Sequence, residues 1–537
     1  MIGRRFDPAV LATVAGTAGD IKTRIAAMQA LDLVHRDEKS NDYAFKHVLL
    51  RDALYDSLLS AARAALHLKV ANEIERRSGN RLVEVTEELA YHYGLTEHSD
   101  KAFMYLVMAA NKSLNVYSVV EADQYYRRAL ALFNDRKECA EPTSAAHAAV
   151  LLLETNFLKG EFGQLWRLSD QYMPLVKKFG EPRDIVLASY YRSLGLMGQL
   201  KHREAEASMR EAFAIAEKLN DARARAYARA GLLFPRIVLG LDSFEIAEAM
   251  KRKLLEGIRD VDDNAICNFG YFYVAWDYMY RGLMKEAGDT ALQLIASGKE
   301  RNDPRALGYA NWLLAWISIV GERFEEALRY ADECIRAAIT PMDRLTGETT
   351  KTVVSIFQGQ SREGLIHLDS AIATMERLGY GYNGTGAARG AALALSGRLA
   401  EGIKFFKRQI ALQDAVGDRM QAAWNRIVLA EIYIQMLSSS ERPPLAIVVK
   451  NIGVIVGATV FGASRAESLL QQAASNSQFS DQGVLRARIN MDLGFLHKLK
   501  KQSARARQFF QKARTPAELQ GFTSMVRKID AELAELG

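Results

Sequence analysis

A short pattern of side chains recurs along this chain. It consists of a small residue, a large residue four positions later, and a small or medium residue three positions after that, and Ala506, Phe510 and Ala513 form its clearest copy. Offsets of four and three place the three side chains on one face of a helix. A helix with one such face cannot bury it alone, so each copy needs neighbouring helices.

Further copies are found through most of the sequence, at Ala122/Tyr126/Ala129, Ala205/Met209/Ala212, Ala287/Ala291/Leu294, Ala327/Ala331/Cys334, Gly364/Leu368/Ala371 and Ala466/Leu470/Ala473. Weaker copies begin at Leu165, Ala247 and Gly402. Successive copies start about 40 residues apart, with one longer step between Gly402 and Ala466. This period predicts an all-α protein, in which helical hairpins of the tetratricopeptide (TPR) kind stack as a right-handed solenoid.

Length and composition agree with an extended array. A chain of 537 residues is too long for one compact core. No uninterrupted apolar run reaches transmembrane length, and the first residues lack the apolar core of a signal peptide. Cys139, Cys267 and Cys334 lie far apart, as expected for buried thiols in a reducing compartment. We therefore expect a cytoplasmic protein with no metal site and no membrane partner.

The amino-terminal segment has a different pattern. Asp7 and Pro8 predict the start of one helix, and Asp20 can cap a second helix that runs to Leu31. Alternating apolar residues around a polar turn (Val34, Tyr43 and Phe45) then predict a short β-hairpin. Two helices followed by a hairpin form a winged-helix pattern, which normally has one more helix at its front. We therefore expect residues 1–60 to be a truncated winged-helix-like segment, 61–120 a helical connector, and 121–537 the repeat array, with an irregular insertion at about 438–463.

Residues Phe45 to Leu58, FKHVLLRDALYDSL, carry a recognisable motif. They resemble the Met-His-Asp-Leu-Leu-Arg-Asp motif that ends the winged-helix domain of STAND-type signalling ATPases; the matching residues are His47, Leu49, Leu50, Arg51 and Asp52. With HLKVANEIERR and ELAYHYGLTEHSDKAFMYLVMAANKS, the chain resembles the carboxy-terminal part of bacterial proteins in which an adenylate-cyclase domain precedes a STAND ATPase and TPR repeats. The resemblance implies that His47 approaches the β-phosphate of bound ADP. The other interpretation is a structural histidine at the end of the hairpin, bonded to backbone.

The chain lacks the parts that would make it an ATPase by itself. No G-x-x-x-x-G-K-[ST] loop occurs in the sequence, and the paired metal-binding aspartates of a cyclase have no recognisable counterpart. We expect no catalytic residue and no cofactor, with ADP or ATP bound only if a partner chain supplies the phosphate loop.

Aromatic residues gather in two neighbouring repeats. Phe269, Phe272 and Trp276 stand 18, 15 and 11 positions before Ala287, and Tyr309, Trp312 and Trp316 stand at the same positions before Ala327. At about 100° per residue these positions point away from the second helix of each hairpin, toward the concave groove of a TPR array. They predict an aromatic site for an apolar peptide segment or a flat ligand. The alternative is that the rings pack on one another or on a nearby loop.

Three further stretches have two interpretations each. After Pro443 and Pro444, a β-branched run predicts an irregular buried segment, with membrane-surface binding as the alternative. Residues Gly379 to Gly390 favour an inter-repeat loop with close-packed glycines over a dinucleotide-binding turn. Between Leu493 and Ala517 there are seven basic residues and no acidic one, which suits a solvated helix face or an anionic partner.

These observations favour a non-enzymatic helical-repeat sensor or scaffold, which binds a protein partner or a small-molecule inducer and regulates an associated STAND ATPase or nucleotide cyclase. One alternative is part of a split cyclase or ATPase that acts with a partner chain. A second is a winged-helix DNA-binding regulator, although the segment Ile21 to Leu31 carries only Lys22 and Arg24 as cations.

Overall fold

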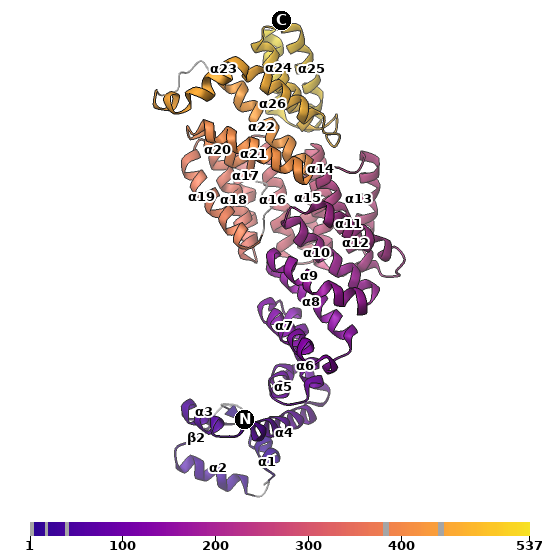
Figure 1. Ribbon diagram of the computed structural model, residues 1–537, viewed down its shortest axis with the longest axis vertical. Helices are drawn as coiled ribbons and strands as arrows, with labels where there is room; N and C mark the ends of the chain where they lie inside the picture. The colour runs from indigo at the N-terminus through magenta and orange to yellow at the C-terminus, as the bar shows by residue number, and fades with distance from the viewer. Residues whose placement is uncertain (1–4, 17–19, 38–41, 380–385, 439–444) are drawn as a thin grey trace. The chain divides into compact units, whose positions relative to one another are not determined.

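The computed structural model describes residues 5–16, 20–37, 42–379, 386–438 and 445–537. Figure 1 shows the chain as a ribbon coloured by residue number. The chain divides into two compact units. Unit 1 contains Met1–Lys159 and Gln171–Asp184, and unit 2 contains Gly160–Asp170 and Ile185–Gly537. Nearly all of the described part is helical.

Unit 1 begins with a small antiparallel sheet. Its strands are β1 (Arg5–Phe6), β2 (Val34–Arg36) and β3 (Tyr43–Phe45), in the order β1-β3-β2. The pairing of β2 with β3, Val34 opposite Phe45, confirms the predicted hairpin. Strand β1 was not predicted, because two residues are too few to show an alternating pattern.

Two short helices connect β1 to β2, as expected. They are α1 (Pro8–Ala15) and α2 (Ile21–Ala30). The Asp7 carboxylate accepts a hydrogen bond of 2.7 Å from the Ala9 N–H and so caps α1, with Pro8 in the first turn. Asp20 stands at the N-cap position of α2, but its side chain makes no capping bond.

The rest of unit 1 is a run of helices that pack in sequence order. They are α3 (Val48–Asp56), α4 (Ser60–Ser78), η1 (Gly79–Val85), α5 (Thr86–Tyr93), α6 (Ser99–Asn115), α7 (Val119–Asp135), η2 (Lys137–Cys139) and α8 (Pro142–Lys159). Val10 and Val14 of α1 pack against Val70 of α4, which joins the sheet region to the helices.

Helices α9 (Phe162–Phe179) and α10 (Pro182–Gly198) contribute residues to both units. The remaining helices belong to unit 2: α11 (His202–Ala216), α12 (Ala222–Leu239), α13 (Phe244–Ile258), α14 (Asn264–Arg281), α15 (Met284–Glu300), α16 (Pro304–Val320), α17 (Phe324–Arg336), α18 (Pro341–Phe357), α19 (Ser361–Arg377), α20 (Gly386–Leu395), α21 (Leu399–Val416), α22 (Arg419–Ser438), α23 (Leu445–Ala474), α24 (Val484–Leu499), α25 (Ser503–Leu519) and α26 (Thr523–Glu535).

Local chemistry sets where these helices begin and end. Side chains cap several first helices of hairpins, through Asp221, Asp263, Asp303 and Thr340, and Thr340 forms a complete capping box with Asp343. Within hairpins, a glycine with positive φ stands one position before the N-cap of the second helix, as at Gly282, Gly359 and Gly397. A left-handed residue reverses the chain within two positions, which holds the two helices of a hairpin against each other.

The repeat pattern marks the buried face of the second helices. Every member of the strong copies is buried, with Ala122, Tyr126 and Ala129 in α7 and Ala506, Phe510 and Ala513 in α25 having no exposed surface. In the weaker copies Leu165, Ala247 and Gly402 are buried too. The fold is therefore the predicted α-solenoid of TPR-like hairpins, with a small amino-terminal β-hairpin.

Unit 2 coils until distant hairpins meet. The Gly163 N–H donates to the Leu378 carbonyl at 3.2 Å, and the Val484 N–H donates to the Gly282 carbonyl at 2.8 Å. Farther along, the Lys528 ammonium lies 2.7 Å from the Glu322 carboxylate. Residues about 200 positions apart are thus in contact. Because each hairpin takes about 40 residues, each hairpin meets the one that lies roughly five hairpins further along the chain.

The insertion differs from its prediction. Residues Leu445–Ala474 form helix α23 and not an irregular segment. The helix kinks at Asn451, whose side chain accepts a 2.9 Å hydrogen bond from the Ala400 N–H and donates one of 3.0 Å to the Gly397 carbonyl. Beyond the kink, Ile452, Val456, Val460 and Phe461 are exposed. A β-branched run costs a helix only tenths of a kcal/mol per residue, so propensity did not decide its structure.

Helix α23 also bears on the expectation that no apolar run in the chain is long enough to cross a membrane. Among the described residues, Asn451–Ala474 is the one helix long and apolar enough to cross a membrane by length and composition, with a mean hydropathy of 1.2. Ala466, Leu470 and Ala473 in its second half are completely buried. That half belongs to the repeat core, whereas the first half presents an apolar face to solvent.

Candidate functional site

The structure brings the predicted aromatic residues of α14 and α16 into one cluster. Phe269 and Phe272 lie 5.3 and 5.4 Å from Tyr309 between ring centroids. Trp276 stacks on Trp312 with centroids 5.1 Å apart and an interplanar angle of 11°. We call these residues, together with Trp316 at 6.1 Å from Trp312, the aromatic cluster.

Each ring of the aromatic cluster is partly buried and none is fully exposed. Phe272, Trp276 and Trp312 pack over Ala275 and Leu313, and Trp316 packs on the next core cluster, which contains Val353. On the other side of α14, the Tyr278 hydroxyl lies 3.2 Å from the Glu248 carboxylate. The rings therefore pack on one another, as the alternative interpretation expected, while keeping part of their surface open to solvent.

The indole N–H groups of Trp276 and Trp316 are unusual. Both nitrogens are buried and neither has a hydrogen-bond partner among the residues that the structure describes. A buried donor without a partner costs about 1–3 kcal/mol. Packing of flat rings thus outweighs hydrogen bonding at these positions. That the cluster anchors a ligand remains a prediction.

His47 stands apart from the hairpin that was expected to end with it. It follows β3 by two residues and occupies the N-cap position of α3, with an exposed side chain that makes no capping hydrogen bond. The expected bond to backbone is therefore not a capping bond of this helix, and a contact with a nucleotide remains a prediction.

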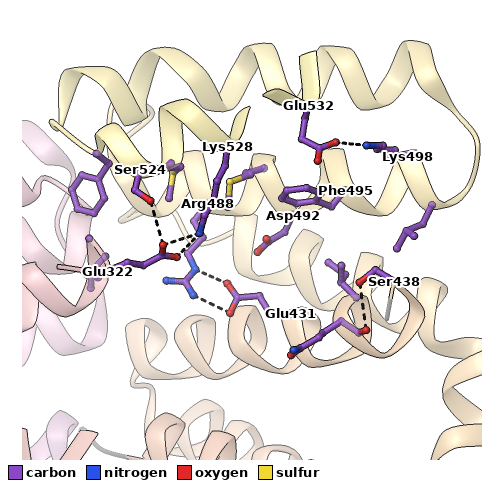
Figure 2. A pocket seen from close by; sticks show the side chains of 18 of the residues that line it. Glu322, Glu431, Ser438, Arg488, Asp492, Phe495, Lys498, Ser524, Lys528 and Glu532 are labelled. Atoms are coloured by element: carbon purple, nitrogen blue, oxygen red, sulfur yellow. Dashed lines mark hydrogen bonds and ion pairs between the residues drawn. The ribbon is translucent and has the colours of Figure 1, made fainter. Parts of the chain in front are cut away.

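Figure 2 shows a pocket that the sequence did not reveal. It has a volume of about 950 Å³ and lies between α22, α24 and α26, beside the turn from α16 to α17. Arg488, Met491 and Phe495 of α24 line it. They stand 18, 15 and 11 positions before Ala506, the same positions as the aromatic residues of α14 and α16. The positional rule could have found these three residues, but not the walls contributed by more distant helices.

Most charged groups in the pocket are paired. Arg488 donates through Nε and Nη2 to the two carboxylate oxygens of Glu431, with the second bond at 2.9 Å. Lys528 pairs with Glu322 at 2.7 Å, and Lys498 pairs with Glu532 at 2.6 Å. Such pairs hold the walls of the pocket in place.

Asp492 is the exception. Its side chain lies between Phe495 and the Arg488–Glu431 pair and is only 5% exposed. Its Oδ2 atom has no hydrogen-bond partner in the described part of the chain. Burial, followed by the negative charge of Glu431, raises the pKa of Asp492 well above its usual range, against the opposing effect of Arg488. A side-chain hydrogen bond with Glu431 raises the pKa of Asp492 further, so this carboxyl has Glu431 as its partner.

Three of the seven basic residues near the carboxyl end form ion pairs within the fold. Lys498 pairs with Glu532 and Glu535, Lys500 with Glu467, and Arg514 with Asp530 and Glu518. Arg505 and Lys512 are exposed, which agrees with the interpretation of the run as a solvated helix face. Within the described ranges, no group of three His, Cys, Asp or Glu side chains is placed to hold a metal ion.

Comparison with known proteins gives a distant likeness. No protein-family model matches the chain, and no curated protein matches its sequence. A Rap protein solved with competence and sporulation factor is 14% identical, over 66% of this chain and 99% of that one, with a TM-score of 0.39. The APC/C hetero-tetramer Cut9-Hcn1 is 13% identical, over 96% and 89%, with a TM-score of 0.38.

A third structure is a STAND protein with a tetratricopeptide repeat sensor from Pyrococcus horikoshii. It is 13% identical over 70% of this chain, which spans 61% of that protein, with a TM-score of 0.32. At such identities and TM-scores, the fold of this chain rests on its own helices.

Proposed function

We propose that this chain is a non-enzymatic helical-repeat sensor or scaffold, which binds an extended apolar segment of a partner protein on the aromatic cluster. The observation that carries the proposal is the equivalence of position: two adjacent first helices hold three aromatic side chains each, and all six form one partly exposed surface. Aromatic side chains in such surfaces dominate binding energies in protein complexes. Their tight packing means that the surface is formed before a ligand arrives.

The test begins with selecting ligands from a phage-displayed library of random peptides. Affinities of the selected peptides are then measured for the wild type and for Trp276→Leu with Trp316→Leu. Leucine keeps apolar volume but loses the flat ring, so we expect the affinity to fall about tenfold or more. The matched control is Trp166→Leu, another partly buried tryptophan, which lies outside the cluster. Equal affinity in all three proteins would contradict the proposal.

The regulatory part of the proposal concerns nucleotide. Residues Phe45 to Leu58 resemble the STAND motif and His47 is exposed, so we propose that partner binding controls an associated ATPase or cyclase that carries the phosphate loop. The chain alone should then show no ADP binding by calorimetry. Micromolar affinity for ADP in the purified chain would contradict this division of roles.

A further inference from the structure

Helix α23, drawn in orange near the carboxyl end of the chain in Figure 1, leaves one apolar face uncovered in its first half. Four large apolar side chains there are each between 56% and 65% exposed: Ile452, Val456, Val460 and Phe461. Intervals of four residues place the first three along one side of the helix, and Phe461 widens this face at its end. The fold holds the other side, because Ala458 is buried and Asn451 forms hydrogen bonds with Gly397 and Ala400. The exposed face is thus a fixed part of the folded molecule.

The charges in and around this face are positive. Between Glu441 and Glu467 the sequence has no acidic residue and three basic ones, Arg442, Lys450 and Arg465. The guanidinium of Arg465 lies over the ring of Phe461, 5.5 Å from the centroid, and its Nη1 atom lies 3.6 Å from a Cβ atom built on Gly457. Arg465 therefore reaches back along the exposed face, and it pairs with no carboxylate in the described part of the chain. An apolar face that carries an unpaired cation suits an occupant that is both apolar and anionic.

Length decides how this helix meets a lipid bilayer. Asn451–Ala474 is long and apolar enough to cross one, but Ala466, Leu470 and Ala473 are buried in the repeat core. The part before that core, residues 452–465, is roughly 21 Å of helix, which is shorter than a hydrocarbon layer of about 30 Å. A helix of this kind lies flat at the surface of a bilayer, with its apolar side between the headgroups and its basic residues beside the lipid phosphates.

A protein partner suits this face less well than a bilayer does. A stable protein interface takes about 20 residues or more from each partner, whereas one side of a few helical turns offers only a few side chains. Binding of a helix to a bilayer requires no matching shape, because it grows with the buried apolar area and with the attraction to anionic lipid. The apolar side chains and the free Arg465 supply both contributions.

We propose that the first half of α23 binds the surface of a membrane that contains anionic phospholipid. Ile452, Val456, Val460 and Phe461 enter the boundary between headgroups and acyl chains, and Arg465 pairs with a lipid phosphate. Membrane-surface binding was the alternative interpretation of this segment, so the proposal departs from the expectation of no membrane partner. It goes beyond the proposed function, because it places the sensor or scaffold at a membrane surface.

Sedimentation with vesicles tests the proposal on the full chain. One set of vesicles contains phosphatidylcholine alone, and the other contains phosphatidylcholine mixed with phosphatidylglycerol, both at physiological salt. We expect the wild type to bind the anionic vesicles about tenfold or more tightly than the neutral ones, because basic residues are attracted to an anionic surface. A wild type that stays in solution with the anionic vesicles would overturn the proposal.

The decisive variant is Val456→Gln with Val460→Gln, which removes apolar surface and leaves the charge of the chain unchanged. Its affinity for the anionic vesicles should fall about tenfold or more, since two apolar side chains no longer enter the bilayer. The matched control is Leu292→Gln with Ile366→Gln, two exposed apolar residues on α15 and α19, which should bind as the wild type does. Circular dichroism and thermal unfolding confirm that both variants are folded. Unchanged binding by the α23 variant would mean that the net charge of +6 attracts the whole chain, and would overturn the assignment.

Arg465→Gln separates the two contributions to binding. Its affinity for the anionic vesicles should fall about fivefold, while its weak binding to neutral vesicles stays the same. Equal losses on both kinds of vesicle would contradict a contact between Arg465 and a lipid phosphate.

Two further measurements keep this site distinct from protein binding. Sedimentation velocity without lipid should give the same mass for the wild type and the Val456→Gln, Val460→Gln variant. A dimer that only the wild type forms would assign the face to a second copy of the chain and overturn the proposal. The variant with Trp276→Leu and Trp316→Leu should bind vesicles as the wild type does, so this result stands apart from the outcome of the peptide selection.

Discussion

Two glycines at the residue scale show how closely the hairpins of unit 2 approach. A Cβ atom built on Gly163 would lie 2.9 Å from the Gly379 Cα atom and 3.3 Å from the Leu378 carbonyl oxygen. Gly379 also has a φ of 78°, which disfavours any other residue. The expected close packing of glycines is thus confirmed at Gly379. Residues 380–385 lie outside the described part, and Gly386 to Gly390 begin helix α20, so they do not form the expected loop.

The surroundings of Gly163 and Gly453 predict that replacement by alanine changes the free energy of unfolding in opposite directions at the two positions. Gly163→Ala should destabilise unit 2 by about 1–3 kcal/mol, because a methyl group meets backbone atoms that cannot move aside. Gly453→Ala in α23 should stabilise it by up to about 1 kcal/mol, since nothing lies within 4 Å of a Cβ there and alanine favours helix. Chemical denaturation followed by tryptophan fluorescence measures both. Effects of the same sign would contradict this explanation.

Asp418 is a second residue whose environment sets its chemistry. It has no exposed surface, its Oδ1 accepts a 3.0 Å hydrogen bond from the Gln421 N–H at the start of α22, and its Oδ2 has no partner in the described chain. Burial raises the pKa of Asp418 to about 7.

The sign of the resulting pH dependence follows from the proton count. Between about pH 4 and pH 7 the folded state keeps a proton on Asp418 that the unfolded state has lost, so stability falls as pH rises. Asp418→Asn retains the capping oxygen and removes the titration. It should be more stable than the wild type by about 1–3 kcal/mol at pH 8 and nearly equal at pH 4. Urea denaturation at the two pH values is the measurement, and an equal gain at both would contradict it.

At the scale of elements, the sequence predicted the regular helical hairpins correctly but not helix α23, which departs from the repeat. Small residues at Ala287, Ala327 and Ala506 mark places where two helices touch, a requirement of packing that leaves a local pattern. Helix α23 was misjudged because no periodicity reveals the two hydrogen bonds that Asn451, at its kink, makes with Gly397 and Ala400.

The two halves of α23 predict different responses to charge. Val460 is 65% exposed, so Val460→Lys should change the free energy of unfolding by less than about 0.5 kcal/mol. Leu470 has no exposed surface, and Leu470→Lys on the same helix should cost more than about 4 kcal/mol, because an unpaired charge would be buried. Thermal and denaturant unfolding measure both. A large effect of Val460→Lys would mean that the exposed face is covered.

At the scale of the whole molecule, the coiling of the hairpins in unit 2 decides which sites can be predicted from the sequence. The aromatic cluster was predictable because its residues lie on adjacent hairpins at equivalent positions. The Asp492 pocket was not, because Glu322, Glu431, Asp492 and Lys528 come together only through the rotation accumulated over several hairpins. That rotation depends on many small packing choices, and no single residue encodes it.

The two units also differ in the groups that acid would protonate. In unit 1, Nδ1 of His67 lies 2.8 Å from Nδ1 of His92, and the Tyr55 hydroxyl lies 3.0 Å from Nε2 of His67. Burial lowers the pKa of both histidines to about 4. In unit 2, burial also lowers the pKa of His202 to about 4, so this histidine makes stability fall as pH falls. The raised pKa of Asp418 has the opposite effect, because it makes stability rise as pH falls.

Acid should therefore unfold unit 1 before unit 2. From about pH 6.5 to pH 4 the unfolded state binds protons that folded His67 and His92 do not, so stability falls as pH falls, by up to about 1.4 kcal/mol per pH unit for each histidine. The five tryptophans, Trp166, Trp276, Trp312, Trp316 and Trp424, all belong to unit 2. Helical circular dichroism should thus decrease in this range before tryptophan emission changes.

A histidine variant identifies the cause of that transition. His92→Asn removes one titrating ring and should shift the loss of circular dichroism to lower pH. The same change at His98, which is exposed in the same unit, should leave the curve where it is. Tryptophan emission that changes together with circular dichroism would show that the units unfold as one. Protonation of the buried pair breaks the hydrogen bond between the rings of His67 and His92. If the curve for His92→Asn did not shift, this pair would not cause the transition, and other groups would govern the acid response.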